Sequence, residues 1–181
     1  MNDYLKSDVY RYYGKNDNKT ILKGFFTNHA VRFLYFLRGA KYSKFIIKRY
    51  ICKFFLSRSR KKYGLEIGSA NQIGKGFYLG HAYNITINPN ALLGNNINIH
   101  KGVTIAQENR GKRMGTPKVG DCVWIGVNST IVGNITIGND VLIAANAFVN
   151  VDIPDHSIVI GNPCKVISRE QATLEYINKK V

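Results

Sequence analysis

This chain of 181 residues has few cysteines and no long apolar run. Its three cysteines, Cys52, Cys122 and Cys164, are an odd set without metal-ligand spacing. We therefore expect no metal site, a reducing compartment, and packing of Cys122 and Cys164 as small apolar groups. No apolar run approaches the ~20 residues that cross a bilayer. The first residues show no basic-then-apolar signal pattern, so a cytoplasmic protein is expected.

Acidic residues are also scarce, above all near the start of the chain. Residues 1–63 hold 16 Lys and Arg against 3 Asp, a net charge of +13, whereas residues 64–164 hold six of each sign. Any anionic partner should therefore meet the N-terminal segment. No nucleic-acid-binding motif accompanies the charge, so we expect no nucleic-acid partner and keep a nucleic-acid-binding module only as an alternative.

What the chain does have is a six-residue repeat between Leu65 and Ile160. A second apolar or small residue usually lies two places before each repeat position, and Gly, Asn and Asp fill the intervals. This pattern predicts short strands joined by sharp corners, three strands to a coil, around an aliphatic centre. A β-sandwich would space its strands irregularly, about 8–12 residues apart. The repeat positions are Ile67, Ile73, Leu79, Ile87, Leu93, Ile99, Ile105, Val119, Ile125, Ile131, Ile137, Ile143 and Val149.

The segment before the repeat is predicted to be helical. Asn28 is a candidate cap for a helix through Leu37 that Gly39 ends, and Ser43 is a candidate cap for a second helix through Leu56. The second helix alternates apolar residues with Lys and Arg. Its apolar side either packs on the solenoid or a neighbouring subunit, or touches an anionic membrane from the inner face.

We expect one structural domain with three segments. Residues 1–63 form the basic N-terminal helical segment, and residues 64–167 form the β-solenoid with a loop at 106–118. Residues 168–181 form a short C-terminal helix, because Ser168 and Gln171 resemble a capping box.

Two departures from the six-residue spacing mark the candidate site. The interval from Leu79 to Ile87 is eight residues and contains His81, and the interval from Ile105 to Val119 is fourteen. A coil with this bulge takes twenty residues, so Glu66 lies about one coil below Thr86, near the histidine loop. The hypothesis is that Glu66 bonds one ring nitrogen of His81 and leaves the other free as a general base. His29 and His156 are most simply surface or packing residues.

Several motifs together resemble a known family. They are the repeated Ile-Gly-x4, Gly74-Lys75-Gly76, the histidine turn, Val103-Thr104-Ile105, and the closing segment 161–167. The chain resembles the hexapeptide-repeat acyltransferases, in the serine acetyltransferase-like branch, and most closely the capsule and exopolysaccharide (colanic-acid type) O-acetyltransferases. The resemblance implies a mainly β protein, a left-handed parallel β-helix, and direct acetyl transfer from acetyl-CoA to a hydroxyl.

The resemblance also implies roles for individual residues. His81 matches the family's catalytic histidine, and Glu66 matches its aspartate partner. A backbone N–H near Ala106 would stabilise the oxyanion. The family forms homotrimers with active sites at subunit interfaces. The residues implied to contact acetyl-CoA are Ala106, Lys112, Arg113, Lys118, Gly126, Ala144, Pro163 and Lys165.

Two departures from the serine acetyltransferases bear on the acceptor. Gly80 replaces an acidic residue, and Gly115-Thr116 replaces an arginine-histidine pair. We therefore expect a sugar hydroxyl as acceptor, on a glycan or nucleotide-sugar precursor of a surface or capsular polysaccharide. The alternatives are a serine O-acetyltransferase, with Arg110 or Arg113 meeting the carboxylate, and a non-catalytic scaffold. The candidate acceptor-binding residues are Gly80, Tyr83, Asn84, His100, Gln107 and Thr116.

Overall fold

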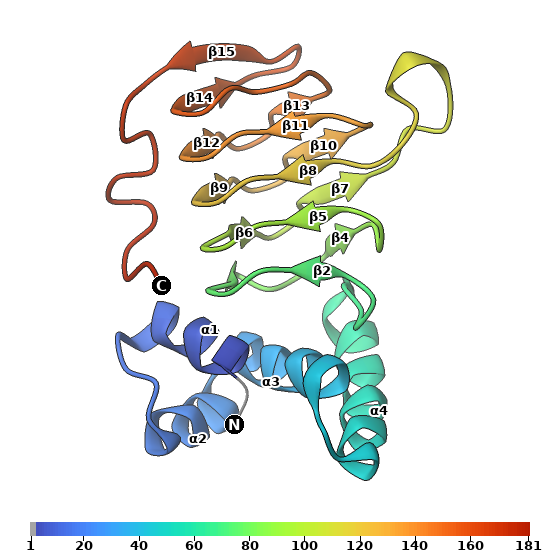
Figure 1. Cartoon of the computed structure of the whole chain (residues 1–181), viewed down its shortest axis with the longest axis vertical. Helices are drawn as coiled ribbons and strands as arrows, with labels where there is room; N and C mark the ends of the chain where they lie inside the picture. Colours follow the sequence, from blue (N-terminus) through green and yellow to red (C-terminus); the bar gives the residue numbers. More distant parts are fainter. Residues whose placement is uncertain (1–2) are drawn as a thin grey trace.

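The computed structural model describes residues 3–181, and these form a three-sided β-solenoid that stands on a group of helices (Figure 1). Each coil contributes one strand to each of three faces, and the strands along a face pair in parallel. This confirms the left-handed β-helix of hexapeptide repeats that the sequence predicts.

The strands are short, as a six-residue repeat requires. Face A contains β1 (Leu65–Glu66), β4 (Ile85–Ile87), β7 (Thr104–Ala106), β10 (Thr130–Val132) and β13 (Phe148–Val149). Face B contains β2 (Gln72–Ile73), β5 (Leu92–Leu93), β8 (Lys118–Val119) and β11 (Thr136–Ile137). Face C contains β3 (Tyr78–Gly80), β6 (Asn98–His100), β9 (Val123–Ile125), β12 (Val141–Ile143), β14 (Ser157–Ile160) and β15 (Lys165–Ser168).

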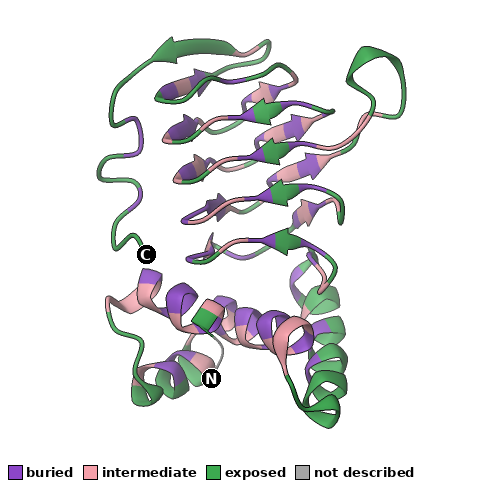
Figure 2. Cartoon of the chain, viewed as in Figure 1, coloured by how far each residue is buried: buried purple, intermediate pink, exposed green. Residues whose placement is uncertain are grey.

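The repeat positions form the core of the prism (Figure 2). All thirteen predicted positions are buried, with exposed fractions of 5% or less. The residues two places before them, such as Phe77, Ile85 and Ile97, are fully buried as well. Burial of this continuous aliphatic column is the main stabilisation of the solenoid, because each buried aliphatic side chain contributes about 1.5–3 kcal/mol.

Four helices precede the solenoid within the described residues: α1 (Asp3–Tyr13), α2 (Asn18–Thr27), α3 (His29–Tyr42) and α4 (Ile46–Tyr63). The predicted cap at Asn28 is confirmed, because its side chain accepts hydrogen bonds from the backbone N–H groups of Ala30 and Val31. The sequence did not predict α2, whose first turn is capped by Asp17.

Both predicted helix ends in this segment are wrong. Helix α3 continues past Gly39 to Tyr42, because Gly39 serves close packing: a β-carbon there would lie 2.5 Å from Sγ of Cys52. Ser43 follows α3 rather than capping α4, and α4 continues to Tyr63, where Gly64 ends it in the left-handed conformation. Cys52 is thereby the buried cysteine, whereas Cys122 and Cys164 are only partly buried.

A buried ion pair fastens the helices to the first coil. Nε of Arg38 lies 2.7 Å from Oδ2 of Asp8, and both side chains are almost completely buried. The guanidinium also donates to the carbonyl oxygens of Ile73 and Gly74, and Asp8 accepts from the N–H of Phe77. Burial raises the pKa of Asp8, and the Arg38 charge opposes that rise. The pair thus joins α1, α3 and the base of the solenoid.

The predicted C-terminal helix is wrong. β15 pairs antiparallel with β14, and the residues after it form turns that descend along face C (Figure 1). The Asp140 carboxylate accepts from the N–H groups of Ala172 and Thr173, from the Thr173 hydroxyl and from the His156 ring. Backbone groups that a helix would pair internally are therefore bonded to the solenoid instead.

Candidate active site

The predicted site residues lie along two different edges of the prism. His81, His100, Gly126 and Ala144 stand where face C turns into face A, which we call the C–A edge. Ala106 and the loop after it stand where face A turns into face B, the A–B edge, and this loop projects from the solenoid (Figure 1). Face A separates the two groups within one chain.

His81 occupies the sharp turn between β3 and β4. It has φ 52°, and Asn84 in the same turn has φ 51°, which accounts for the eight-residue interval. The N–H of Tyr83 donates to the His81 carbonyl over 2.7 Å, and the N–H of Asn84 donates to the carbonyl of Tyr63. The turn is therefore fixed to the end of α4, and it presents the exposed His81 ring at the C–A edge.

Gly80 makes room for the ring of His100. The two residues are paired on neighbouring strands, and a β-carbon at position 80 would lie 2.5 Å from Nδ1 of His100. His100 in turn packs against Trp124, with ring centroids 4.8 Å apart, and Trp124 packs against Tyr176. Burial lowers the pKa of His100, and the nearby His81, whose ring centroid is 6.5 Å away, lowers it further. Both effects favour the neutral form of the His100 ring.

Glu66 lies on face A and not against His81. It is in register with Thr86, as the coil length predicts, and among residues 3–181 it makes no hydrogen bond to His81. Instead it lines a cleft of about 450 Å³ together with Arg60, Asn71 and Ala106. The predicted bond between Glu66 and His81 is therefore absent from the single chain.

The loop on the A–B edge is a closed hairpin. Glu108 and Gly115 exchange backbone hydrogen bonds of 3.0 Å in both directions, and residues Gly111–Arg113 form a short 3₁₀ turn between them. Nε of Arg113 lies 3.0 Å from Oε2 of Glu108, with both side chains partly exposed. Gly115 has φ 132°, a conformation that favours glycine. Sequence reasoning passed over Glu108, although opposite charges on either side of Gly111 are a signal for such a pair.

The other candidates for the acceptor are largely occupied with structural contacts. Tyr83 packs against His29 and Tyr63, and Gln107 bonds Asn88 and Asn109. The Thr116 hydroxyl donates to the carbonyl of Asn90 over 3.1 Å. These contacts order the two edges.

The residues implied to bind acetyl-CoA are also divided. Gly126 and Ala144 are stacked on the C–A edge, where a β-carbon at 126 would lie 2.6 Å from the N atom of Ala145. Lys112, Arg113 and Lys118 belong to the A–B loop and the strand that follows it. Pro163 lies just before β15, and Lys165 is the first residue of that strand. Within residues 3–181, no group of three or more His, Cys, Asp or Glu is placed to hold a metal ion.

Fold and edges together define a hexapeptide-repeat β-helix with a histidine turn on one edge and a charged hairpin on another. Residues 116–150 match the family of bacterial transferase hexapeptide proteins (six repeats). The chain is 40% identical to serine acetyltransferase 2 of Arabidopsis thaliana over 113 residues, which are 61% of this chain and 34% of that protein. It is 33% identical to a serine acetyltransferase of Staphylococcus epidermidis over 124 residues, 68% of this chain and 58% of the relative.

Solved structures extend this similarity to the helices. The serine acetyltransferase of Neisseria gonorrhoeae superposes with a TM-score of 0.74 at 29% identity, covering 92% of this chain and 65% of that one. The soybean serine acetyltransferase apoenzyme gives 0.73 at 28% identity, covering 91% and 67%. The chain is thus a hexapeptide-repeat protein of the serine acetyltransferase-like branch, and it spans about a third to three fifths of the length of the curated relatives described above.

These relatives contradict the expected sugar acceptor and favour the serine alternative. They also give no support to a special closeness to the capsule O-acetyltransferases. The structure supplies the physical reason for the error. The sugar prediction rested on the replacement of charged residues by Gly80 and Gly115. The His100 ring fills the space beside Gly80, and Gly115 closes the hairpin, so neither glycine opens a site for a sugar ring.

Proposed function

We propose that this protein is a serine O-acetyltransferase that uses acetyl-CoA as its acetyl donor. The observation that carries the proposal is the similarity to serine acetyltransferases in both the sequence and 91–92% of the structure. The reaction would join the serine hydroxyl oxygen to the acetyl carbonyl carbon, while the carbon–sulfur bond of the thioester breaks.

His81 is proposed as the general base. It would take the proton from the serine hydroxyl and return it to the departing thiolate of CoA, so no covalent enzyme intermediate is required. The turn that fixes His81 by backbone bonds to Tyr63 limits its motion, which suits proton transfer at short range. Glu66 is proposed as its partner, although in a single chain the two side chains do not meet.

A homotrimer would bring the two edges together. With face A of each prism turned toward the threefold axis, the C–A edge of one subunit would lie beside the A–B edge of the next. One site would then hold His81 of one subunit and the hairpin of its neighbour. The candidate acetyl-CoA contacts fall on both edges, which is the arrangement expected for a substrate bound in a groove between subunits.

The hairpin supplies the charges that free serine requires. Glu108 offers a carboxylate for the ammonium group of serine, and Arg113 offers a guanidinium for its carboxylate. A zwitterion can exchange for their mutual ion pair, whose two side chains are exposed enough to be reached. This pair takes over the role left open by Gly80 and Gly115-Thr116.

Steady-state kinetics with acetyl-CoA test the proposal. L-Serine should be converted to O-acetylserine, detected by mass spectrometry, whereas nucleotide sugars and oligosaccharides should remain unmodified. His81→Ala should lower turnover by ~10²-fold or more and leave assembly and CoA binding intact. His156→Ala is the matched control and should keep full turnover, because His156 lies in a turn near the far end of the solenoid. Transfer to a sugar with none to serine would refute the proposal.

The cytoplasmic location expected from the sequence stays a prediction. Within residues 3–181 no helix is long and apolar enough to cross a membrane. A position at the inner face of a membrane, predicted from the N-terminal charge, would depend on α4.

A further inference from the structure

Helix α4 exposes an apolar ridge that no part of residues 3–181 covers. Phe45 is 76% exposed and Ile47 is 73% exposed. Two series of exposed residues follow at intervals of four, Ile46, Tyr50 and Phe54 in one and Ile47 and Ile51 in the other. Residues four apart lie on the same side of a helix, so these side chains extend along one side of α4 over its first three turns. We define the α4 ridge as Phe45, Ile46, Ile47, Tyr50, Ile51 and Phe54, all of which are at least half exposed.

The opposite side of α4 accounts for its attachment to the protein. Cys52, Leu56 and Tyr63 are its buried residues. Cys52 packs into the notch left by Gly39 on α3, and Phe55 stacks on Phe36 with centroids 5.2 Å apart. The ridge residues therefore do not take part in packing α4 onto the rest of the chain. In Figure 2 the outer side of α4 is exposed along its length.

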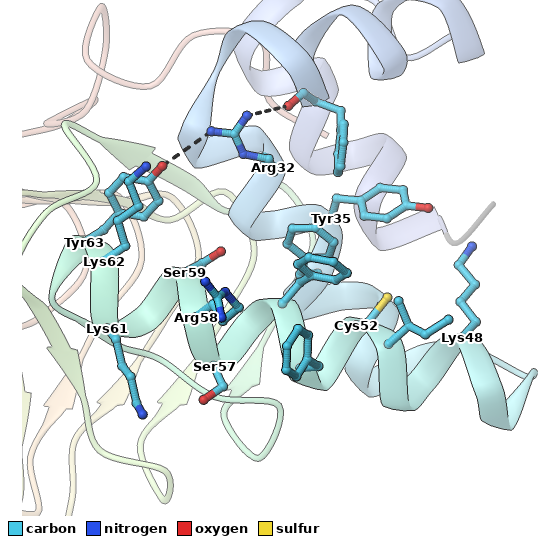
Figure 3. Close-up of a pocket in the computed structure, with 15 residues that line it drawn as sticks. Arg32, Tyr35, Lys48, Cys52, Ser57, Arg58, Ser59, Lys61, Lys62 and Tyr63 are labelled. Atoms are coloured by element: carbon cyan, nitrogen blue, oxygen red, sulfur yellow. Dashed lines mark hydrogen bonds between the residues drawn. The ribbon is translucent and has the colours of Figure 1, made fainter.

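A groove of about 1020 Å³ runs beside the ridge, between α3 and α4 (Figure 3). Its floor is aromatic, with Phe25, Tyr35, Phe36 and Phe55, and its rim is basic. Figure 3 shows Lys48 toward one end of the groove and Lys62 toward the other. Ridge and groove together form a continuous apolar surface bordered by cations.

The charge on this surface has one sign. Residues 18–65 contain 13 Lys and Arg and no Asp or Glu. Lys53 lies over the ring of Tyr50 and Arg58 over the ring of Phe54, at 5.5 and 5.8 Å from the centroids. Their charged groups thus lie directly beside aromatic rings of the ridge, and basic groups next to apolar side chains are typical of a helix at a lipid–water boundary.

This charge pattern decides between occupants. A second copy would place the same basic border against its own equivalent, and like charges in contact are repulsive. A deformable anionic layer accepts a convex apolar ridge and pairs with the cations on both sides.

We propose that the α4 ridge docks on the surface of an anionic phospholipid bilayer, with α4 lying in the plane of the interface. The apolar side chains enter the boundary between headgroups and acyl chains, and Lys48, Arg49 and Lys53 contact lipid phosphates. The α3–α4 corner, where the ridge begins, points away from the solenoid (Figure 1).

Vesicle flotation with the full chain tests this proposal without reference to enzymatic activity. The protein should bind vesicles of phosphatidylcholine mixed with phosphatidylglycerol and dissociate from them at high salt. It should not bind vesicles of pure phosphatidylcholine. Lys48→Gln/Arg49→Gln/Lys53→Gln should lower the partition coefficient by roughly 100-fold, at about a factor of five for each basic residue. Lys15→Gln/Lys19→Gln/Lys23→Gln removes the same charge outside α4 and should bind nearly as the wild type does.

The apolar contribution needs its own variant. Ile46→Ser/Phe54→Ser should lower binding roughly tenfold or more, and Leu174→Ser, at an equally exposed leucine on the C-terminal segment, should not. Equal losses in the two charge variants, or equal binding to both kinds of vesicle, would overturn the proposal. A change in oligomer size on sedimentation for Ile46→Ser/Phe54→Ser would also overturn it and make the ridge an interface between copies.

Discussion

At the scale of single residues, Gly80 and His100 act as a pair. Gly80→Ala should cost about 1–3 kcal/mol of unfolding free energy, because the new methyl group meets a ring that is already packed on Trp124. His100→Ala removes the obstacle, so the double variant should be more stable than the sum of the two single changes indicates. Urea unfolding of the four proteins measures this coupling. Strict additivity would mean that the ring does not occupy the space beside Gly80.

A buried charge gives a second prediction at this scale. Asp8→Asn should cost about 3–5 kcal/mol, since Arg38 would keep its charge in the interior without a carboxylate. Asp17→Asn is the same chemical change at an exposed helix cap and should be nearly neutral, because Asn caps a helix as well as Asp does. Denaturant midpoints for the two variants make the comparison. Similar midpoints would show that the Arg38–Asp8 pair does not hold the helices to the solenoid.

At the scale of elements, the repeat could be predicted from the sequence because it is local. Each strand and corner is specified within six residues, so Ile67 and its equivalents reveal the solenoid directly. The contact between Gly80 and His100 could not be predicted in this way, since it joins side chains on successive coils. The prediction of a C-terminal helix was wrong for a related reason. Ser168 and Gln171 fit a local capping pattern, but the carboxylate of Asp140, some thirty residues earlier, accepts hydrogen bonds from the backbone of Ala172 and Thr173.

The same limit applies to the candidate site. His81 could be located because it breaks the six-residue spacing, and its turn is as expected. Its predicted partner Glu66 has the expected register with Thr86, yet register does not bring the side chains into contact. The Glu108–Arg113 pair required knowledge of the hairpin that joins them.

The C-terminal segment should be held more weakly as the pH rises. The hydrogen bond to Asp140 raises the pKa of His156, and Glu170 and Asp155 reinforce that rise. The contribution of the charged His156 is therefore complete below the unfolded value of about 6.5 and is lost as the pH passes through the higher folded value. Burial acts to raise the pKa of Asp140, but hydrogen bonds from Thr173 and His156 outweigh it and lower that pKa, so the carboxylate stays charged throughout this range.

Hydrogen exchange of the Thr173 amide across pH 5.5 to 8.5, corrected for intrinsic rates, measures this release. Protection should fall in the wild type and should be lower but independent of pH in His156→Gln. A Thr173 amide whose protection in the wild type did not change with pH would separate His156 from the attachment of the segment.

At the scale of the whole molecule, the division of site residues between two edges is the central feature. One chain presents His81 on the C–A edge and the Glu108–Arg113 hairpin on the A–B edge, with face A between them. An acetyl transfer that uses both groups therefore needs a second subunit. The proposed trimer is in this sense part of the proposed active site, and serine acetylation should depend on assembly.

Mixing two inactive variants tests this account most directly. His81→Ala lacks the base, and Arg113→Ala lacks the proposed contact to the serine carboxylate. Co-refolding of equal amounts yields mixed trimers, verified by native mass spectrometry, in which one site in about four combines an intact His81 with an intact hairpin from the neighbouring subunit. Serine acetylation should recover to about a quarter of the wild-type rate. Mixed trimers that remain as inactive as the separate variants would contradict a serine acetyltransferase site shared between subunits.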